Sequence, residues 1–193
     1  VGGQEVANKI AEILGTKAES MVEKTARVMC AGTYEKCKVK FDYTGIEDCT
    51  AAAGLFAGPS ACSFGCVGLG NCVKACAFDA IVVKDGLAQV IEAKCKACGK
   101  CIEACPKKII EMVPKKSEYS VTCSSKDKGA VVRKNCTIGC IGCGKCSKVC
   151  PVSAITVNGT LAKINTEVCT SCGECAAACP TGAIKKITCC IGS

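Results

Sequence analysis

The stretch "CIGCGKCSKVCP", from Cys140 to Pro151, decides the fold class of this chain. Three of its cysteines follow one another at intervals of two residues, and a fourth stands directly before a proline. Cysteines spaced in this way are badly placed to form disulfides with one another, but they converge well on one inorganic centre. Structural zinc more often uses two separate C-x-x-C knuckles. The run of three cysteines plus a fourth before proline therefore favours iron–sulfur chemistry.

Cysteine dominates the composition of the chain. The 193 residues include 23 cysteines and no histidine or tryptophan, which is typical of a disulfide scaffold or a metal carrier. Disulfide scaffolds are usually short, secreted and irregularly spaced, whereas these cysteines recur in a regular pattern. Thiolate ligation predicts a reducing compartment, the cytoplasm. No signal peptide is visible, and no apolar run reaches the about 18 residues that a membrane span needs.

The formal net charge of +8 does not by itself indicate nucleic-acid binding. A [4Fe–4S]²⁺ core with four thiolates carries a charge of about −2, so four such clusters would bring the loaded protein close to neutrality. The chain has few aromatic residues for base stacking and no recognition motif. We therefore expect no nucleic-acid partner.

An internal repeat divides the chain. Adding 74 to the number of each of nine cysteines in the first half gives another cysteine, and Pro106 gives Pro180. This period is longer than that of solenoid repeats and predicts two tandem domains. We expect an N-terminal segment at 1–60, a first domain at 61–114 and a second domain at 115–188. The matching cysteines are Cys49–Cys123, Cys62–Cys136, Cys66–Cys140, Cys72–Cys146, Cys76–Cys150, Cys95–Cys169, Cys98–Cys172, Cys101–Cys175 and Cys105–Cys179.

Each repeat is itself built from two similar halves around a hairpin. The turns at Asp85-Gly86 and Asn158-Gly159 are flanked by short apolar strands, and the segments after the cysteine runs suit single helical turns. The N-terminal segment predicts a helix over 5–15 that packs on the next segment of the chain, strands over 25–30 and 38–43, and a helix over 46–57. The fold class is therefore α+β, and the expected small cores contain Ile81, Val83, Ile91, Ile110, Ile155, Val157, Ile164 and Ile184.

The spacing also predicts the ligands of four [4Fe–4S] clusters, about sixteen irons in total. In two-cluster patterns the cysteine before proline ligates the other cluster of the pair. In the second repeat this gives one set of Cys140, Cys143, Cys146 and Cys179, and one of Cys150, Cys169, Cys172 and Cys175. In the first repeat the same rule gives Cys76, Cys95, Cys98 and Cys101.

The remaining set of the first repeat is irregular, because Leu69 stands where the second repeat has Cys143. Cys66, Cys72 and Cys105 keep their counterparts, so one ligand is missing. Cys62 lies only four positions before Cys66 and is the expected substitute, with Cys49 as the alternative.

Seven cysteines fall outside these four sets, and the spacing assigns them no role. The second repeat keeps Cys143 and lacks no ligand, so Cys136 and Cys123 are not needed there as substitutes. They are either buried packing beneath the cluster loop or a thiol pair able to form a disulfide, and we expect packing. The seven are Cys30, Cys37, Cys49, Cys123, Cys136, Cys189 and Cys190.

From Cys62 to about Ile187 the chain resembles the bacterial dicluster ferredoxins, which implies two tandem ferredoxin-like 2[4Fe–4S] domains. Ala77, where proline is usual, and the Cys62-to-Cys72 spacing depart from that pattern. The segments "GGQEVANKIAEILG", "GIEDCTAAAGLFAGPSACSFGCVGLGNCVKACAFDAI" and "VTCSSKDKGAVVRKNCTIGCIGCGKC" further resemble the B subunit of the Rnf complex, an ion-translocating ferredoxin:NAD⁺ oxidoreductase.

The Rnf resemblance implies a function and a location. The chain is expected to accept low-potential electrons from soluble ferredoxin and to relay them to other subunits of a membrane complex. This part is expected to be soluble at the cytoplasmic face of the cell membrane. In that family a membrane anchor and a further iron–sulfur domain precede the "GG" helix, so the resemblance implies that both lie upstream of Val1.

We expect no catalytic site within the chain itself. There is no P-loop and no complete G-x-G-x-x-G, so no NAD or flavin site is expected. A free-standing polyferredoxin, the electron-input arm of a soluble oxidoreductase, and a redox or iron sensor remain alternatives, although no output domain for a sensor is visible. Lysines beside the cysteine loops either balance cluster charge or steer an acidic ferredoxin; they are Lys94, Lys96, Lys100, Lys107, Lys108, Lys145 and Lys148.

Overall fold

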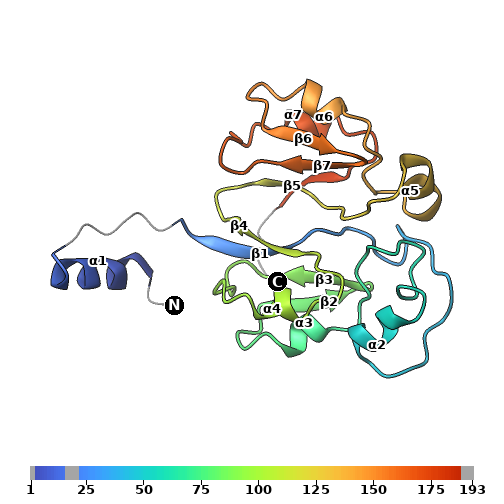
Figure 1. The fold of residues 1–193 in the computed structure, drawn as a ribbon, viewed down its shortest axis with the longest axis horizontal. Helices are drawn as coiled ribbons and strands as arrows, with labels where there is room; N and C mark the ends of the chain where they lie inside the picture. Colours follow the sequence, from blue (N-terminus) through green and yellow to red (C-terminus); the bar gives the residue numbers. More distant parts are fainter. Residues whose placement is uncertain (1–2, 16–21, 188–193) are drawn as a thin grey trace.

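The computed structural model describes residues 3–15 and 22–187, and most of them form two small α+β units of the same design (Figure 1). Each unit contains two antiparallel pairs of strands. In the first unit β1 (Lys24–Val28) pairs with β4 (Ile110–Pro114), and β2 (Ile81–Lys84) pairs with β3 (Leu87–Val90). In the second, β5 (Tyr119–Val121) pairs with β8 (Ile184–Lys186), and β6 (Ile155–Asn158) pairs with β7 (Leu161–Ile164).

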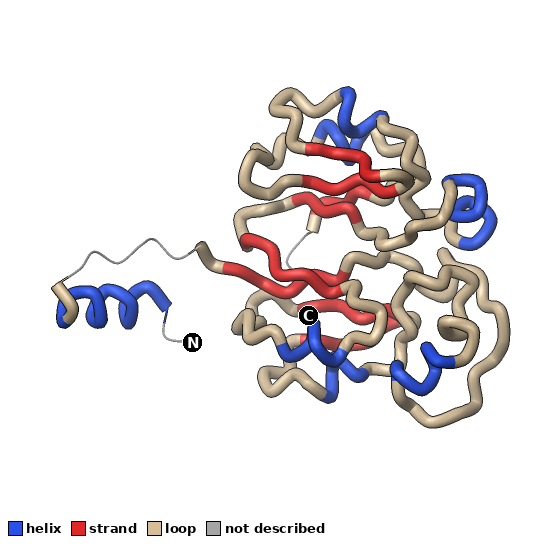
Figure 2. The backbone as a smooth tube through the Cα atoms, in the orientation of Figure 1, coloured by secondary structure: helices blue, strands red, loops and turns tan. Residues whose placement is uncertain are grey.

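Four helices of about one turn follow the cysteine loops. A glycine in the left-handed region precedes each, such as Gly99 with φ 85° and Gly173 with φ 86°. This conformation suits glycine and turns the chain from the loop into the helix. The helices are α3 (Asn71–Lys74), α4 (Lys100–Ala104), α6 (Lys145–Lys148) and α7 (Glu174–Ala177). Figure 2 shows the strands of both units in the middle of the molecule, with these helices beyond them at either end.

The two predicted hairpins are confirmed. Ile81 faces Val90 across the first, and Ile155 faces Ile164 across the second. A cysteine loop packs directly on each hairpin turn. A Cβ atom added at Gly68 would lie 2.6 Å from the carbonyl oxygen of Gly86, and one added at Gly142 would lie 2.8 Å from that of Thr160. Glycine is therefore needed where the loop crosses the turn.

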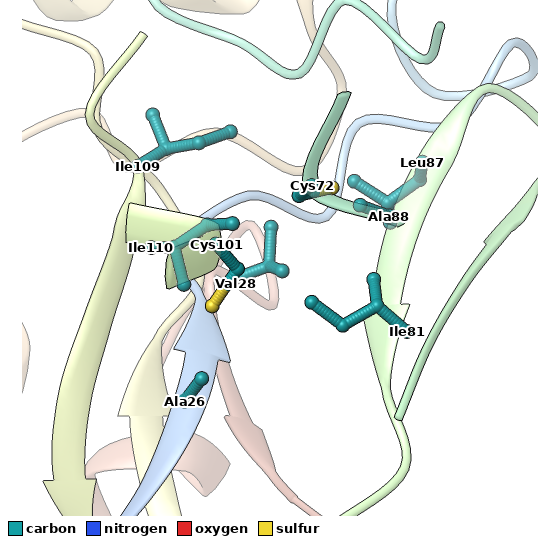
Figure 3. Close-up of a cluster of buried hydrophobic side chains, with 9 residues drawn as sticks. All are labelled: Ala26, Val28, Cys72, Ile81, Leu87, Ala88, Cys101, Ile109 and Ile110. Atoms are coloured by element: carbon teal, nitrogen blue, oxygen red, sulfur yellow. The ribbon is translucent and has the colours of Figure 1, made fainter. Parts of the chain in front are cut away.

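Each unit has one small apolar core that includes cysteines. In Figure 3 the side chains of the first core converge from β1, β2, β3, β4 and two helices, with Cys72 and Cys101 among them. The second core is built in the same way from Val121, Ile155, Ile164 and Ile184 with Cys140, Cys146 and Cys175. Because so few aliphatic side chains are available, the cysteines form part of the packing and whatever they bind contributes to folding.

The first unit reaches back to Lys24, because β1 supplies the partner of β4. Between β1 and the first cysteine loop lies a long connection with α2 (Cys49–Gly54). The strand expected over 38–43 does not form. The connection there has only the isolated bridges Cys37–Cys136 and Val39–Ser60, and the first of these ties it to the residue after α5 (Gly129–Asn135) of the second unit.

The N-terminal helix α1 (Gly3–Ile13) lies apart from the two units in Figure 1. The side chains of Val6, Ile10 and Ile13 are exposed, so the expected packing against the following segment is not seen in the described residues. No helix in the part of the chain that the structure describes is both long and apolar enough to cross a membrane.

Candidate metal centres

A cavity in the first unit is lined by four cysteines, Cys49, Cys66, Cys72 and Cys105. Its other walls come from the first core, including Val28 and Ile110. Burial, together with the nearby sulfurs of Cys66, Cys49 and Cys105, raises the pKa of the Cys72 thiol to about 12. The cavity therefore concentrates thiols in an apolar setting, which suits a cluster that replaces their protons with iron.

Cys49 is held at this cavity by the start of α2. The side chain of Asp48 caps the helix by accepting the backbone N–H groups of Thr50 and Ala51, both at 2.8 Å. The Asn71 side chain donates to Asp48 Oδ2 at 2.7 Å and accepts the Cys49 N–H at 2.8 Å. Because Asn71 directly precedes Cys72, these bonds fix Cys49 beside the cysteine loop.

Cys62, which the spacing predicts as the fourth member of the set with Cys66, Cys72 and Cys105, does not line this cavity. It lines a neighbouring cavity between the two units. The alternative residue, Cys49, occupies the position instead. The physical reason is that α2 folds back onto the loop, so a residue distant in sequence comes closer than one four positions away.

A second cavity of the first unit brings together the predicted set of Cys76, Cys95, Cys98 and Cys101. Two of the sulfurs accept backbone N–H groups: Ala80 donates to Cys76 Sγ and Ala26 to Cys95 Sγ, each at 3.4 Å. Such bonds favour the thiolate over the thiol. Cys98 is exposed whereas Cys101 is buried, so one corner of this cavity faces solvent.

The second unit repeats both arrangements. Cys140, Cys143, Cys146 and Cys179 line one cavity. For the other set, the sulfurs of Cys169 and Cys172 lie near Cys175, and with burial they raise its pKa to about 11. Cys150 packs on the same core, and its sulfur accepts the Ala154 N–H at 3.3 Å, as Cys76 does from Ala80 in the first unit.

The four cysteine sets fit the geometry of a cluster. Among the described residues, no three His, Cys, Asp or Glu side chains converge tightly enough to hold a single metal ion. A four-iron cube needs its thiolates spread around its corners, and three cavities of the described residues are each lined by four cysteines. Backbone N–H donors and apolar walls at these sites stabilise bound thiolates and exclude water.

A further cavity lies between the two units, and sequence reasoning missed it. It is lined by Cys30, Cys37, Cys62, Cys123 and Cys136, and also by Cys66. One alternative held that Cys136 forms a thiol pair with Cys123. The Cys136 sulfur instead accepts a hydrogen bond from the Cys37 thiol. This hydrogen bond lowers the pKa of Cys136 to about 6 and raises the pKa of Cys37. Cys189 and Cys190 lie outside the described residues.

The lysines beside the cysteine loops fall into two groups. The Lys107 Nζ donates to the carbonyl oxygens of Ala57 at 2.6 Å and Ser63 at 2.9 Å, so it braces the connection rather than facing a partner. The lysines whose side chains are exposed are Lys94, Lys96, Lys100, Lys108, Lys145 and Lys148.

Comparisons with known families agree with this arrangement. Residues 88–111 match the 4Fe-4S binding domain family, and residues 139–183 match the 4Fe-4S dicluster domain family. The chain is therefore an iron–sulfur electron-transfer protein with two ferredoxin-type domains, and these domains hold four [4Fe–4S] clusters.

Similar proteins point to one family. The chain is 48% identical over 166 residues to the B subunit of the Na⁺-translocating ferredoxin:NAD⁺ oxidoreductase complex of Acetobacterium woodii. It is 44% identical over 168 residues to the B subunit of the proton-translocating complex of Clostridium ljungdahlii. Each match covers 86% of this chain but only 50% and 59% of the relative. Over the part that it spans, the chain belongs to the B-subunit family of these complexes.

The solved structures add no further argument. A formate dehydrogenase–heterodisulfide reductase–formylmethanofuran dehydrogenase complex from Methanospirillum hungatei is 22% identical to this chain. The match covers 61% of this chain and 50% of that one, with a TM-score of 0.25.

Proposed function

We propose that this chain is the electron relay of an ion-translocating ferredoxin:NAD⁺ oxidoreductase, working at the cytoplasmic face of the membrane. It takes low-potential electrons from reduced ferredoxin and passes them through four [4Fe–4S] clusters to other subunits of the complex. The observation that carries this proposal is the set of cavities lined by four cysteines, two in the first unit and one in the second. The names of the relatives supply the complex and the ferredoxin substrate.

The ligand sets follow the spacing, with one revision. We call the two sets that contain Cys66 and Cys140 the inner sets, and the other two the outer sets. In the first unit, Cys49 replaces Cys62 in the inner set. The proposed sets are Cys49, Cys66, Cys72 and Cys105; Cys76, Cys95, Cys98 and Cys101; Cys140, Cys143, Cys146 and Cys179; and Cys150, Cys169, Cys172 and Cys175. When bound, each cluster supplies reversible one-electron transfer. The chain's own residues hold it in an apolar pocket, and their N–H groups stabilise its thiolates.

The outer set of the first unit is the best entry point for electrons from an acidic ferredoxin. Its exposed ligand Cys98 is flanked by the exposed side chains of Lys94, Lys96 and Lys100. The corresponding Cys172 of the second unit is also exposed, but it has Glu167 and Glu174 nearby in sequence instead of lysines. Charge complementarity therefore favours docking at Cys98 over docking at Cys172.

Electron transfer from reduced ferredoxin to the loaded chain should slow as ionic strength rises, because exposed charges are screened beyond about 8–10 Å in physiological salt. The double variant Lys96→Glu/Lys100→Glu should slow the second-order rate about tenfold or more at low salt. Stopped-flow absorbance of cluster reduction measures both effects. The matched control is Lys163→Glu, an exposed charge reversal on β7 of the second unit, which should leave the rate nearly unchanged.

A rate that ignores salt, or that falls equally in the Lys163→Glu control, would contradict docking at Cys98. A loaded chain that reduced ferredoxin cannot reduce at all would contradict the proposed function itself.

A further inference from the structure

The cavity between the two units has a matched pair of cysteines on each side. The repeat equates Cys62 with Cys136. The strand pairing adds a second equivalence. Val28 pairs with Ile110 in the first unit, and Val121 pairs with Ile184, the repeat counterpart of Ile110, in the second. Cys30 and Cys123 each stand two residues after these valines and therefore occupy equivalent positions. All four line the cavity.

The hydrogen bonds to these sulfurs repeat the equivalence. The Cys30 sulfur accepts the backbone N–H of Cys66, and the Cys123 sulfur accepts that of Cys140, the counterpart of Cys66. In the same way, Phe64 and Gly65 donate their N–H groups to Cys62, as Ile138 and Gly139 do to Cys136. Burial raises the pKa of Cys30, Cys62 and Cys123, and these N–H donors offset part of that effect.

The sulfurs face a common space. A Cβ atom added at Gly32 would lie 3.7 Å from Cys30 Sγ and 3.8 Å from Cys136 Sγ. A Cβ atom added at Gly65 would lie 3.8 Å from Cys30 Sγ and 3.7 Å from Cys62 Cβ. Gly32 and Gly65 thus keep side chains out of the space between these sulfurs. Asp127 is the charged residue in the cavity wall.

The two units are tied together around this cavity. Ser124 Oγ donates to the Met29 carbonyl oxygen at 2.7 Å, and the backbone N–H of Lys38 donates to Asn135 O at 2.9 Å. The backbone N–H of Thr137 donates to Lys36 O, also at 2.9 Å. The cysteines of the two units are thereby held opposite one another.

We propose that Cys30, Cys62, Cys123 and Cys136 hold a further [4Fe–4S] cluster between the two units. The four thiols release four protons as they bind a [4Fe–4S]²⁺ core, which leaves a site of net charge about −2. The thiol of Cys37 donates a hydrogen bond to the Cys136 sulfur and is not itself a ligand.

This cluster links the two halves of the relay, a role that rests on the function proposed above. Its cavity shares Cys66 with the inner site of the first unit. On its other side, Cys123 accepts the N–H of Cys140, which lines the inner site of the second unit. A cluster held by these four cysteines would supply one-electron transfer between the two inner sites.

The loaded wild-type chain tests the proposal without any substitution. Anaerobically isolated protein should contain about 20 irons and 20 sulfides, against about 16 for the ferredoxin-type sets alone. Native mass spectrometry should show five clusters. Four clusters in a chain that reduced ferredoxin still reduces would overturn this inference and leave the proposed function intact, whereas five clusters that ferredoxin cannot reduce would do the reverse.

Single substitutions test the ligand assignment. Cys136→Ala and Cys123→Ala should each lose about four irons and one cluster's spin intensity in EPR, while the signals of the ferredoxin-type clusters remain. Cys37→Ala, which removes a buried thiol of the same cavity, should keep about 20 irons. Loss of iron from Cys37→Ala with full retention by Cys123→Ala would overturn the assignment. Zinc at the site, or a Cys37–Cys136 disulfide in anaerobically alkylated protein, would also overturn it.

Discussion

Replacing Cys49 with serine is expected to remove the inner cluster of the first unit, a loss of about four irons per chain. Cys49 lines the cavity of Cys66, Cys72 and Cys105, and a serine hydroxyl does not provide the soft thiolate that iron–sulfur clusters prefer. The cavity walls belong to the first core, so the variant should also unfold at a lower temperature. Iron and sulfide analysis measures the first effect, with EPR to detect a three-iron remnant.

Cys37→Ser is the matched control for this experiment. Cys37 and Cys49 belong to the same connection and are buried to the same degree, at 7% and 8% exposure. Neither belongs to a C-x-x-C run. Serine at 37 should leave the iron content unchanged. If Cys49→Ser retains the iron of the wild type, Cys49 is not a ligand and the revised set is wrong.

Sequence spacing pointed to Cys62 because it measures only distance along the chain. The repeat did not discriminate between the two candidates, since it equated Cys62 with Cys136 and Cys49 with Cys123, and the second repeat lacks no ligand for either to replace. Strand pairing instead equates Cys123 with Cys30. The connection after Cys30 therefore has no counterpart in the second unit, and Cys49 lies within it. The sequence indicates Asp48 as an N-cap of α2, but it does not reveal the hydrogen bond that the Asn71 side chain donates to Asp48.

What the sequence predicted well is local. The hairpins at Asp85-Gly86 and Asn158-Gly159, and the short helices after the cysteine loops, depend on residues a few positions apart. Core prediction succeeded for inward positions such as Ile81 and Ile155, whereas Val83 is 37% exposed. The pairing of β1 with β4 depends on contacts between residues remote in sequence. Local sequence patterns do not reveal contacts between residues so far apart in the chain. The cavity between the units was missed for the same reason.

The second large effect concerns Arg27 on β1, a buried charge that contacts both repeats. Its guanidinium pairs with Glu92 of the first unit at 2.8 Å, and the two side chains are only 5% and 10% exposed. The other terminal nitrogen donates to Ser117 O at 2.8 Å and Ser120 Oγ at 3.0 Å, at the entry to the second unit. Its Nε has no hydrogen-bond partner among the described residues.

Arg27→Met should destabilise the loaded protein by about 3–5 kcal/mol, because it removes the buried cation that pairs with the Glu92 carboxylate at 2.8 Å. For a chain of this size, that corresponds to an apparent Tm lower by about 10 °C. Arg27→Lys should recover only part of the loss, since an ammonium cannot reproduce the fork of contacts to Glu92, Ser117 and Ser120. Anaerobic thermal unfolding, followed by cluster absorbance and by circular dichroism, measures these shifts.

Lys115→Met is the control that distinguishes the loss of the buried Arg27–Glu92 pair from the loss of an exposed ion pair beside β1 and β4. Lys115 pairs with Glu23 at 3.0 Å, but the two side chains are 40% and 77% exposed, so water screens the pair and its removal should change the Tm little. Arg27→Met/Glu92→Gln removes both buried charges and should unfold at a higher temperature than Arg27→Met alone. If Arg27→Met and Lys115→Met unfold at the same temperature, the buried pair does not stabilise the junction. If the double variant is no better than the single one, the cost comes from the bonds to Ser117 and Ser120 instead.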